Sequence, residues 1–168
     1  KILISMTNKR FYHIGFGQDD LGASPPKIVL LSGDRDRTHL IAQNYLQDVR
    51  LLSQNRGLDS YLGYLPNHRP ILCATSGMGA PSLSIVVNEL VQVGIRQIIR
   101  IGTCGSIQPH ISVGSIVISS AALCRQGAAN DIAPIEYPAA ADPFLTVALV
   151  KAAQELGFEH FLGITASV

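Results

Sequence analysis

The sequence predicts an α/β fold in which a central, largely buried sheet is flanked by helices. Short apolar segments alternate along the chain with segments whose apolar residues recur at helical spacing. Strands with few polar residues are typical of a sheet that is covered on both faces. Hydrophobic residues make up 47% of the chain and charged residues 15%, which excludes a wholly disordered protein. Because 168 residues is the size of one ordinary domain, we expect a single domain over residues 1–168.

Seven segments predict strands, because they are short, mostly apolar and bounded by turn residues. They are residues 27–32, 49–54, 58–64, 70–75, 97–101, 113–124 and 160–168.

Two helices are predicted in the first two thirds of the chain. Asp34 is a suitable N-cap for a helix over about residues 35–46. A second helix has Pro81 in its first turn and ends before Gly94. Its apolar face consists of Leu83, Val86, Val87, Leu90 and Val91.

A third helix begins at Asp142 and Pro143, which suit a cap and a first-turn position, and it ends before Gly157. The segment 127–141 precedes it, is rich in Ala and Pro and is predicted to be a loop. The apolar face of the third helix is expected to consist of Leu145, Ala148, Leu149, Ala152 and Leu156.

The charge of the chain argues against two classes of partner. The formal net charge is +1, from 13 basic and 12 acidic residues, and there is no long basic run. A nucleic-acid binder or a polybasic membrane-surface protein usually carries a larger or more clustered excess. No apolar run reaches the ~18 residues of a membrane-spanning helix. We therefore expect no nucleic acid and no membrane among the partners.

The cysteines and histidines do not indicate a disulfide framework or a metal site. Cys73, Cys104 and Cys124 form no CxxC pair, and no His, Asp or Glu spacing is typical of a metal site. Each cysteine lies in an apolar stretch, so we expect buried, reduced thiols and a cytoplasmic location. His39 is expected at the surface.

Three glycine-containing turns follow predicted strands, at residues 32–37, 76–79 and 102–105. Ligands of α/β sheets bind at the carboxyl ends of strands, where glycine lets backbone N–H groups approach an anion. Taken singly, each turn is a weak signal. None matches GxGxxG or GxxxxGK[ST], which argues against dinucleotide and Walker-type nucleotide binding.

Arginines near these turns make the anion hypothesis more specific. Arg37 follows Gly33 by one helical turn, and Arg100 lies inside an apolar run. Arg100 is interpreted either as half of a structural ion pair or as an anion ligand, because guanidinium donates parallel bonds to phosphate oxygens. Thr103 could add a hydroxyl and Gly33 a backbone N–H. Arg35 is expected to be a solvated helix residue.

Taken in order, five motifs resemble the nucleoside phosphorylase family of the hexameric type. They are YHIG at 12–15, GDRDR at 33–37, NRG at 55–57, SGMGAPS at 76–82 and RIGTCG at 100–105. The stretch from Arg100 to Val117 is more similar to uridine phosphorylases than to purine phosphorylases. The resemblance implies a mixed sheet in a three-layer α/β/α arrangement, and it implies that this chain is the N-terminal two-thirds of the family pattern.

The resemblance implies a phosphate site built from two loops. Gly33 and Arg37 correspond to the first phosphate loop of the family. Arg100 and Thr103 correspond to the second loop and are the expected catalytic residues, with Thr103 also reaching the ribose. Arg56 corresponds to an arginine that family members lend to the phosphate site of a neighbouring subunit.

The nucleoside side of the site is implied in the same way. His13 corresponds to a histidine donated across the subunit interface to the ribose 5′-hydroxyl. Cys104 and Gly105 correspond to residues on the base side. The implied partners are a nucleoside, phosphate and further copies of the chain, in a homodimer or hexamer with shared sites.

The implied activity is phosphorolysis in nucleotide salvage, which converts uridine and phosphate into uracil and ribose 1-phosphate. Phosphate is a co-substrate, and no cofactor or metal is implied. The alternatives are a purine nucleoside phosphorylase and a truncated, non-catalytic homologue that binds phosphate or nucleoside. Hydrolytic nucleosidases of the same superfamily are disfavoured, because they do not need the phosphate arginines.

Three departures from the family pattern affect these expectations. Ser32 and Arg35 stand where the first phosphate loop usually has prolines. Gly57 stands where uridine phosphorylases often have a Glu linked to a monovalent cation, so we do not expect that cation here. The Glu-Met-Glu ribose segment and the residues that read uracil are not in the sequence.

Overall fold

The computed structural model describes residues 9–167, which form two compact units. The first unit extends to Thr103 and the second begins at Cys104, and each is described by itself. The predicted α/β class is confirmed, although the strands form a five-stranded and a two-stranded sheet. The single domain expected over residues 1–168 stays a prediction.

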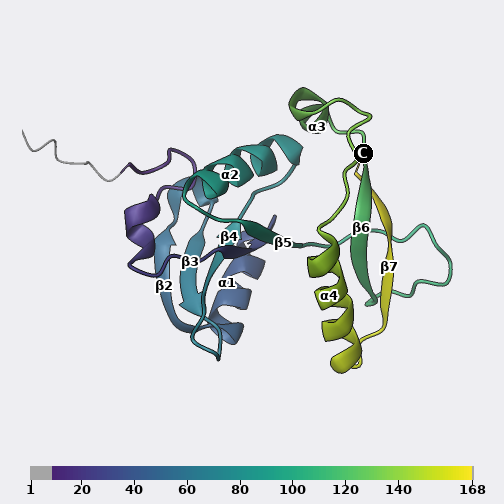
Figure 1. Ribbon diagram of the computed structural model, residues 1–168, viewed down its shortest axis with the longest axis horizontal. Helices are drawn as coiled ribbons and strands as arrows, with labels where there is room; N and C mark the ends of the chain where they lie inside the picture. Colours follow the sequence, from purple (N-terminus) through teal and green to yellow (C-terminus); the bar gives the residue numbers. More distant parts are fainter. Residues whose placement is uncertain (1–8, 168) are drawn as a thin grey trace, which may run out of the picture. The chain divides into compact units, whose positions relative to one another are not determined.

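The sheet of the first unit is mixed and has the strand order β2-β3-β4-β1-β5 (Figure 1). Strand β1 is parallel to its neighbours β4 and β5, whereas β3 is antiparallel to β2 and β4. All five strands were predicted, with small differences at their ends. They are β1 (Ile28–Ser32), β2 (Gln47–Ser53), β3 (Ser60–Tyr64), β4 (Pro70–Thr75) and β5 (Gln97–Ile101).

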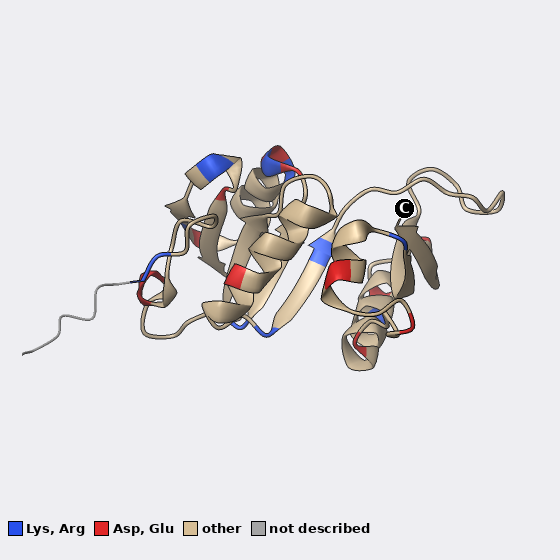
Figure 2. Cartoon of the chain, turned by 90° about the horizontal axis from the view of Figure 1, so that it is seen from above, with Lys and Arg blue, Asp and Glu red and all other residues tan. Residues whose placement is uncertain are grey.

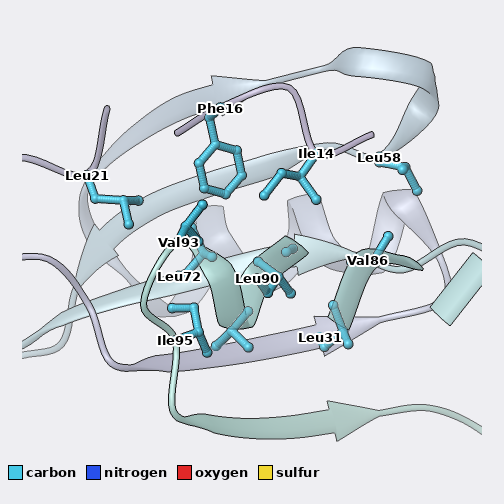
Figure 3. Close-up of a cluster of buried hydrophobic side chains, with 12 residues drawn as sticks. Ile14, Phe16, Leu21, Leu31, Leu58, Leu72, Val86, Leu90, Val93 and Ile95 are labelled. Atoms are coloured by element: carbon cyan, nitrogen blue, oxygen red, sulfur yellow. The ribbon is translucent and has the colours of Figure 1, made fainter. Parts of the chain in front are cut away.

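Helices α1 (Arg35–Tyr45) and α2 (Ala80–Gln92) cover opposite faces of this sheet. Successive strand residues point to opposite faces, so Leu72 and Cys73 of β4 belong to different cores. Leu72 belongs to the same buried cluster as the α2 residues Val86 and Leu90 (Figure 3), and Cys73 packs on the α1 side. The first unit therefore has three layers, as expected. The 3-10 helix η1 (Gln18–Leu21) precedes β1, and the 3-10 helix η2 (Asn55–Gly57) lies between β2 and β3.

The ends of α1 and α2 follow the local signals. The Asp34 carboxylate accepts hydrogen bonds from the backbone N–H groups of Asp36 (2.8 Å) and Arg37 (3.3 Å), so it caps α1 as predicted. Pro81 lies in the first turn of α2. The predicted apolar face of α2 is wrong at Val91, which is 45% exposed, while Val93 just beyond the helix is buried.

The second unit contains the parallel strands β6 (Ile116–Cys124) and β7 (His160–Ser167), against which α4 (Pro143–Glu155) packs. Asp142 caps α4 through a bond from the backbone N–H of Leu145. The segment 127–141 is not wholly a loop, because it contains α3 (Gly127–Ile132).

The predicted apolar face of α4 is only partly right. Ala153 is the buried residue of this helix, and Leu145 and Leu149 are half-buried. Ala148, Ala152 and Leu156 are exposed, because the stripe that meets the strands follows spacing i, i+4, i+8. The C-terminal residue of the predicted last strand, Val168, lies outside the described residues.

Two features bear on the expected partners. In the part of the chain that the structure describes, no helix has the length and hydrophobicity needed to cross a membrane. Lys and Arg are interspersed with Asp and Glu along this part of the chain (Figure 2). The absence of nucleic-acid and membrane partners stays a prediction.

Replacing Leu72 by Ala tests the core of the first unit. Leu72 is fully buried in the central strand β4, so Leu72→Ala leaves a cavity and is expected to lower the free energy of unfolding by about 2–5 kcal/mol. Leu40→Ala on α1 is the matched control, since Leu40 is 56% exposed. Urea denaturation measures both variants, and equal losses would contradict the assignment of Leu72 to the core.

Candidate functional site

The parallel strands of the first unit bring three predicted turns to one sheet edge. Ser32 at the end of β1 pairs in register with Thr75 of β4 and with Ile101 of β5. The turns that follow these residues therefore leave the sheet side by side. The backbone N–H of Ser76 donates to the carbonyl oxygen of Ser32 at 2.7 Å, which ties two of the turns together.

Arg100 lies against two of these turns. A Cβ atom added to Gly33 would lie 3.3 Å from Arg100 Nη2 and 3.3 Å from the Gly77 carbonyl oxygen. A Cβ added to Gly102 would lie 2.9 Å from Arg100 Nη1. Glycine at both positions thus leaves room for the guanidinium group between the turns.

Arg37 reaches the same turn from α1. Its Nη1 donates to Ser32 Oγ at 3.5 Å, and its Nη2 lies 3.9 Å from Asp34 Oδ2. Arg37 and Arg100 therefore both approach the segment Ser32–Gly33. The N-terminus of α1 begins directly after this segment and adds favourable partial charge for an anion.

The ion-pair interpretation of Arg100 is not supported. The ion pairs between described residues involve Arg10, His13, Arg35 and Arg37, and none of them includes Arg100. Arg100 is exposed despite its apolar neighbours in sequence. Its charge therefore has no carboxylate partner within the described residues, which leaves it available to an external anion.

The expectation of a solvated Arg35 is wrong in one respect. Its side chain is 55% exposed, but Nε donates to Oδ2 of the buried Asp59 at 2.7 Å. This hydrogen bond and the charge of the carboxylate raise the pKa of Arg35. No local sequence pattern signals this pair, because Arg35 and Asp59 lie 24 residues apart.

A second group of predicted residues, His13 and Arg56, shares one surface. Asn55 Nδ2 donates to the carbonyl oxygens of Tyr12 (2.6 Å) and His13 (2.9 Å). The Arg56 guanidinium lies 5.3 Å from the centre of the Tyr12 ring and donates to the Tyr12 hydroxyl at 3.3 Å. No hydrogen bond or ion pair among the described residues joins His13 or Arg56 to Arg37 or Arg100.

Glu89 of α2 fixes the His13 segment. Its carboxylate accepts from the backbone N–H groups of His13 (3.1 Å) and Ile14 (2.9 Å), and Oε1 lies 2.6 Å from His13 Nδ1. Burial opposes ionisation, but the bonds from Ile14 and His13 outweigh it and lower the pKa of Glu89. Sequence reasoning missed Glu89, although a lone carboxylate beside the apolar face of a helix was a possible signal.

Within the described residues, no hydrogen bond or ion pair joins Thr103 to Arg37 or Arg100. Thr103 is exposed and ends the first unit, whereas Cys104 and Gly105 belong to the second unit. The roles of all three stay predictions. A small hollow of about 140 Å³ in the second unit, between β6 and the α3 region, contains none of the predicted site residues.

The three cysteines differ in their burial. Cys73 is buried, and burial raises the pKa of its thiol to about 12. Cys104 is exposed, so the expectation of buried thiols is wrong there. Within residues 9–167, no group of three His, Cys, Asp or Glu side chains is placed to hold a metal ion. The expected absence of a metal stays a prediction.

Comparison with known families shows which family the chain belongs to. A family model described as the phosphorylase superfamily matches residues 27–168. The chain belongs to the phosphorylase superfamily. The chain spans only about half to two thirds of the length of the curated relatives that it matches.

Two of these relatives are uridine phosphorylases. The chain is 43% identical over 140 residues to that of Haemophilus influenzae, covering 83% of this chain and 55% of the relative. It is 40% identical over 162 residues to that of Escherichia coli, covering 96% and 62%. It is also 40% identical over 155 residues to a DeoD-type purine nucleoside phosphorylase of Caldanaerobacter subterraneus, covering 90% and 64%.

The Glu89 contacts generate a pH-dependent prediction. Because the pKa of Glu89 in the folded chain lies below the ordinary value of 4.5, its ionised form stabilises the fold above pH 4.5. That contribution is lost as the pH falls through the lowered pKa. Glu89→Gln is therefore expected to cost about 1–3 kcal/mol at pH 7 and progressively less in acid.

Urea denaturation at a series of pH values measures this effect. Glu155→Gln on α4 is the control, since Glu155 is exposed. A constant difference between Glu89→Gln and the unmodified chain from pH 7 to pH 3 would argue against a stabilising ionised carboxylate.

Proposed function

We propose that the protein containing this chain catalyses the phosphorolysis of a pyrimidine nucleoside, converting uridine and phosphate into uracil and ribose 1-phosphate. The observation that carries the proposal is the placement of the Arg100 guanidinium over Gly33, with Arg37 reaching the same turn. The identities of 40–43% to uridine phosphorylases favour this reaction. Nucleotide salvage in the cytoplasm is the proposed setting.

In the proposed reaction, a phosphate oxygen attacks C1′ of the nucleoside. The new C1′–O bond forms as the C1′–N bond breaks, and the electron pair of the broken bond leaves with the base. The sugar passes through a transition state with oxocarbenium character. Arg37 and Arg100 would hold the phosphate beside this developing positive charge, with Gly33 donating a backbone N–H and Thr103 a hydroxyl to it. No cofactor is needed for these steps.

We propose that His13 and Arg56 act on the site of a second copy of the chain. Both lie on one surface that Asn55 and Tyr12 organise, and neither is bonded to the Arg37–Arg100 group. His13 would then contact the ribose 5′-hydroxyl and Arg56 the phosphate of that copy. This arrangement requires a homodimer or a hexamer built from such dimers. Cys104 and Gly105 are proposed to line the base side.

Purine nucleoside phosphorolysis is the second candidate. The 40% identity to a DeoD-type purine nucleoside phosphorylase favours it, and the anion site is compatible with either base. A non-catalytic module would retain phosphate binding without nucleoside binding. Calorimetric titrations of this chain with phosphate and with uridine separate the module from the enzyme.

Arg100→Ala tests the proposed enzyme activity. Losing a guanidinium that contacts phosphate in the transition state is expected to raise the KM for phosphate and to lower kcat by about 10²-fold. Uracil release from uridine, measured at a series of phosphate concentrations, gives both constants. Arg69→Ala is the control, since Arg69 is exposed and lies before β4, away from the strand ends described above.

Two results would overturn the proposal. The first is release of uracil at an undiminished rate without phosphate, which indicates hydrolysis. The second is an Arg100→Ala variant whose kinetics match those of Arg69→Ala.

A further inference from the structure

The ion pair between Arg35 and Asp59 is unusual because one partner is buried. Asp59 is 2% exposed, whereas the Arg35 side chain is 55% exposed. Besides the 2.7 Å bond from Arg35 Nε, Asp59 Oδ2 accepts a long bond of 3.5 Å from Gln54 Nε2. Oδ1 is buried and has no hydrogen-bond partner within the described residues. Arg35 is thus the cation that compensates a poorly solvated carboxylate.

The pair belongs to a two-point polar contact between α1 and β3. One helical turn beyond Arg35, His39 Nδ1 lies 3.2 Å from the Tyr61 hydroxyl. Asp59 directly precedes β3 and Tyr61 is the second residue of that strand, so both polar contacts are made at the start of β3. The Asp59 carbonyl oxygen also accepts from the backbone N–H of Thr75 at 2.9 Å, at the end of β4. The first two turns of α1 are consequently held to β3 and, through Asp59, to the sheet edge where the anion site lies.

The geometry of α1 connects this contact to Arg37. Arg35 and Arg37 are two residues apart, so their side chains project about 200° apart around the helix. In the sheet order β2-β3-β4-β1-β5, Arg35 reaches toward β3, and Arg37 reaches Ser32 on β1, next to β5. Holding Arg35 against Asp59 therefore turns Arg37 toward the turn that Arg100 approaches.

Arg35 is the first residue of α1. Proline at the first helical position fixes φ at about −65°. Arg35 lacks this backbone restraint. Its bond to Asp59 supplies a different restraint at the same place.

We propose that Arg35 and Asp59 are positioning residues of the phosphate site, which hold the first turn of α1 so that Gly33 and Arg37 face the anion. The inference rests on the proposed function. Neither residue touches the phosphate, and each acts through the placement of Gly33 and Arg37.

The test measures KM for phosphate, KM for uridine and kcat for the full-length protein and its variants. Arg35→Ala and Asp59→Asn are each expected to raise the KM for phosphate about tenfold, the effect of losing one charge-assisted hydrogen bond, with little change in the KM for uridine. The double variant Arg35→Ala/Asp59→Asn is expected to lose no more than either single variant, because the two residues act as one unit. Asp36→Asn is the matched control, since it makes the same substitution on an exposed carboxylate in the same helical turn.

Rescue by proline distinguishes positioning from a general loss of stability. Arg35→Pro/Asp59→Asn removes the pair and introduces the backbone restraint of proline in its place, so its KM for phosphate is expected to return to within about twofold of the unmodified protein. Arg35→Ala/Asp59→Asn lacks both restraints and keeps the raised KM. Neither double variant leaves a buried charge unpaired. The two can therefore be compared even if Asp59→Asn or Arg35→Ala alone fails to fold.

The possible failures are distinguishable. If the unmodified protein releases uracil only with phosphate and the two double variants share its KM for phosphate, the positioning role is overturned and the proposed function stands. Equally raised KM values for phosphate in both double variants also overturn the positioning role. In that case the pair stabilises the fold in general and does not place Gly33 and Arg37 through the first turn of α1. If the unmodified protein shows no phosphate dependence, the proposed function fails and this inference fails with it.

Discussion

The parallel register of β1, β4 and β5 is the constraint on which the candidate site depends. Because Ser32 pairs with both Thr75 and Ile101, three turns that are distant in sequence leave the sheet at one edge. Arg100 can then lie over Gly33 and Gly102 at the same time. A shift of one residue in either pairing would turn these side chains to opposite faces of the sheet and separate them. The chemistry proposed for this phosphorylase superfamily member therefore depends first on strand register.

Charge balance distinguishes the arginines of this edge from one another. Arg100 has no carboxylate partner within the described residues, and Arg37 has only a distant one in Asp34, whose carboxylate already caps α1. Arg35 is instead committed to the buried Asp59. The same short segment thus contains one arginine that is paired with a buried carboxylate and one that is held only by long contacts to Ser32 and Asp34. Their two-residue spacing on a helix points them in opposite directions.

Sequence reasoning predicted the features that depend on neighbouring residues. The Asp34 cap, the first-turn proline of α2 and all five strands of the first unit follow from local patterns. It did not predict Asp59 or Glu89, because their partners lie 24 and 76 residues away in sequence. The face of α4 was misplaced because helical periodicity leaves several overlapping apolar stripes, and the two strands beneath it select only one of them. The roles of Thr103, Cys104 and Gly105 stay predictions drawn from the resemblance.

A phosphate titration followed by NMR would show whether Gly33, Arg37 and Arg100 bind one anion. We expect saturable shifts of the Gly33 backbone amide and of the Arg37 and Arg100 side-chain Nε–H resonances, with one common dissociation constant. Shifts confined to other parts of the chain, or an unchanged Gly33 amide at saturating phosphate, would contradict the assignment of these three residues to one anion site.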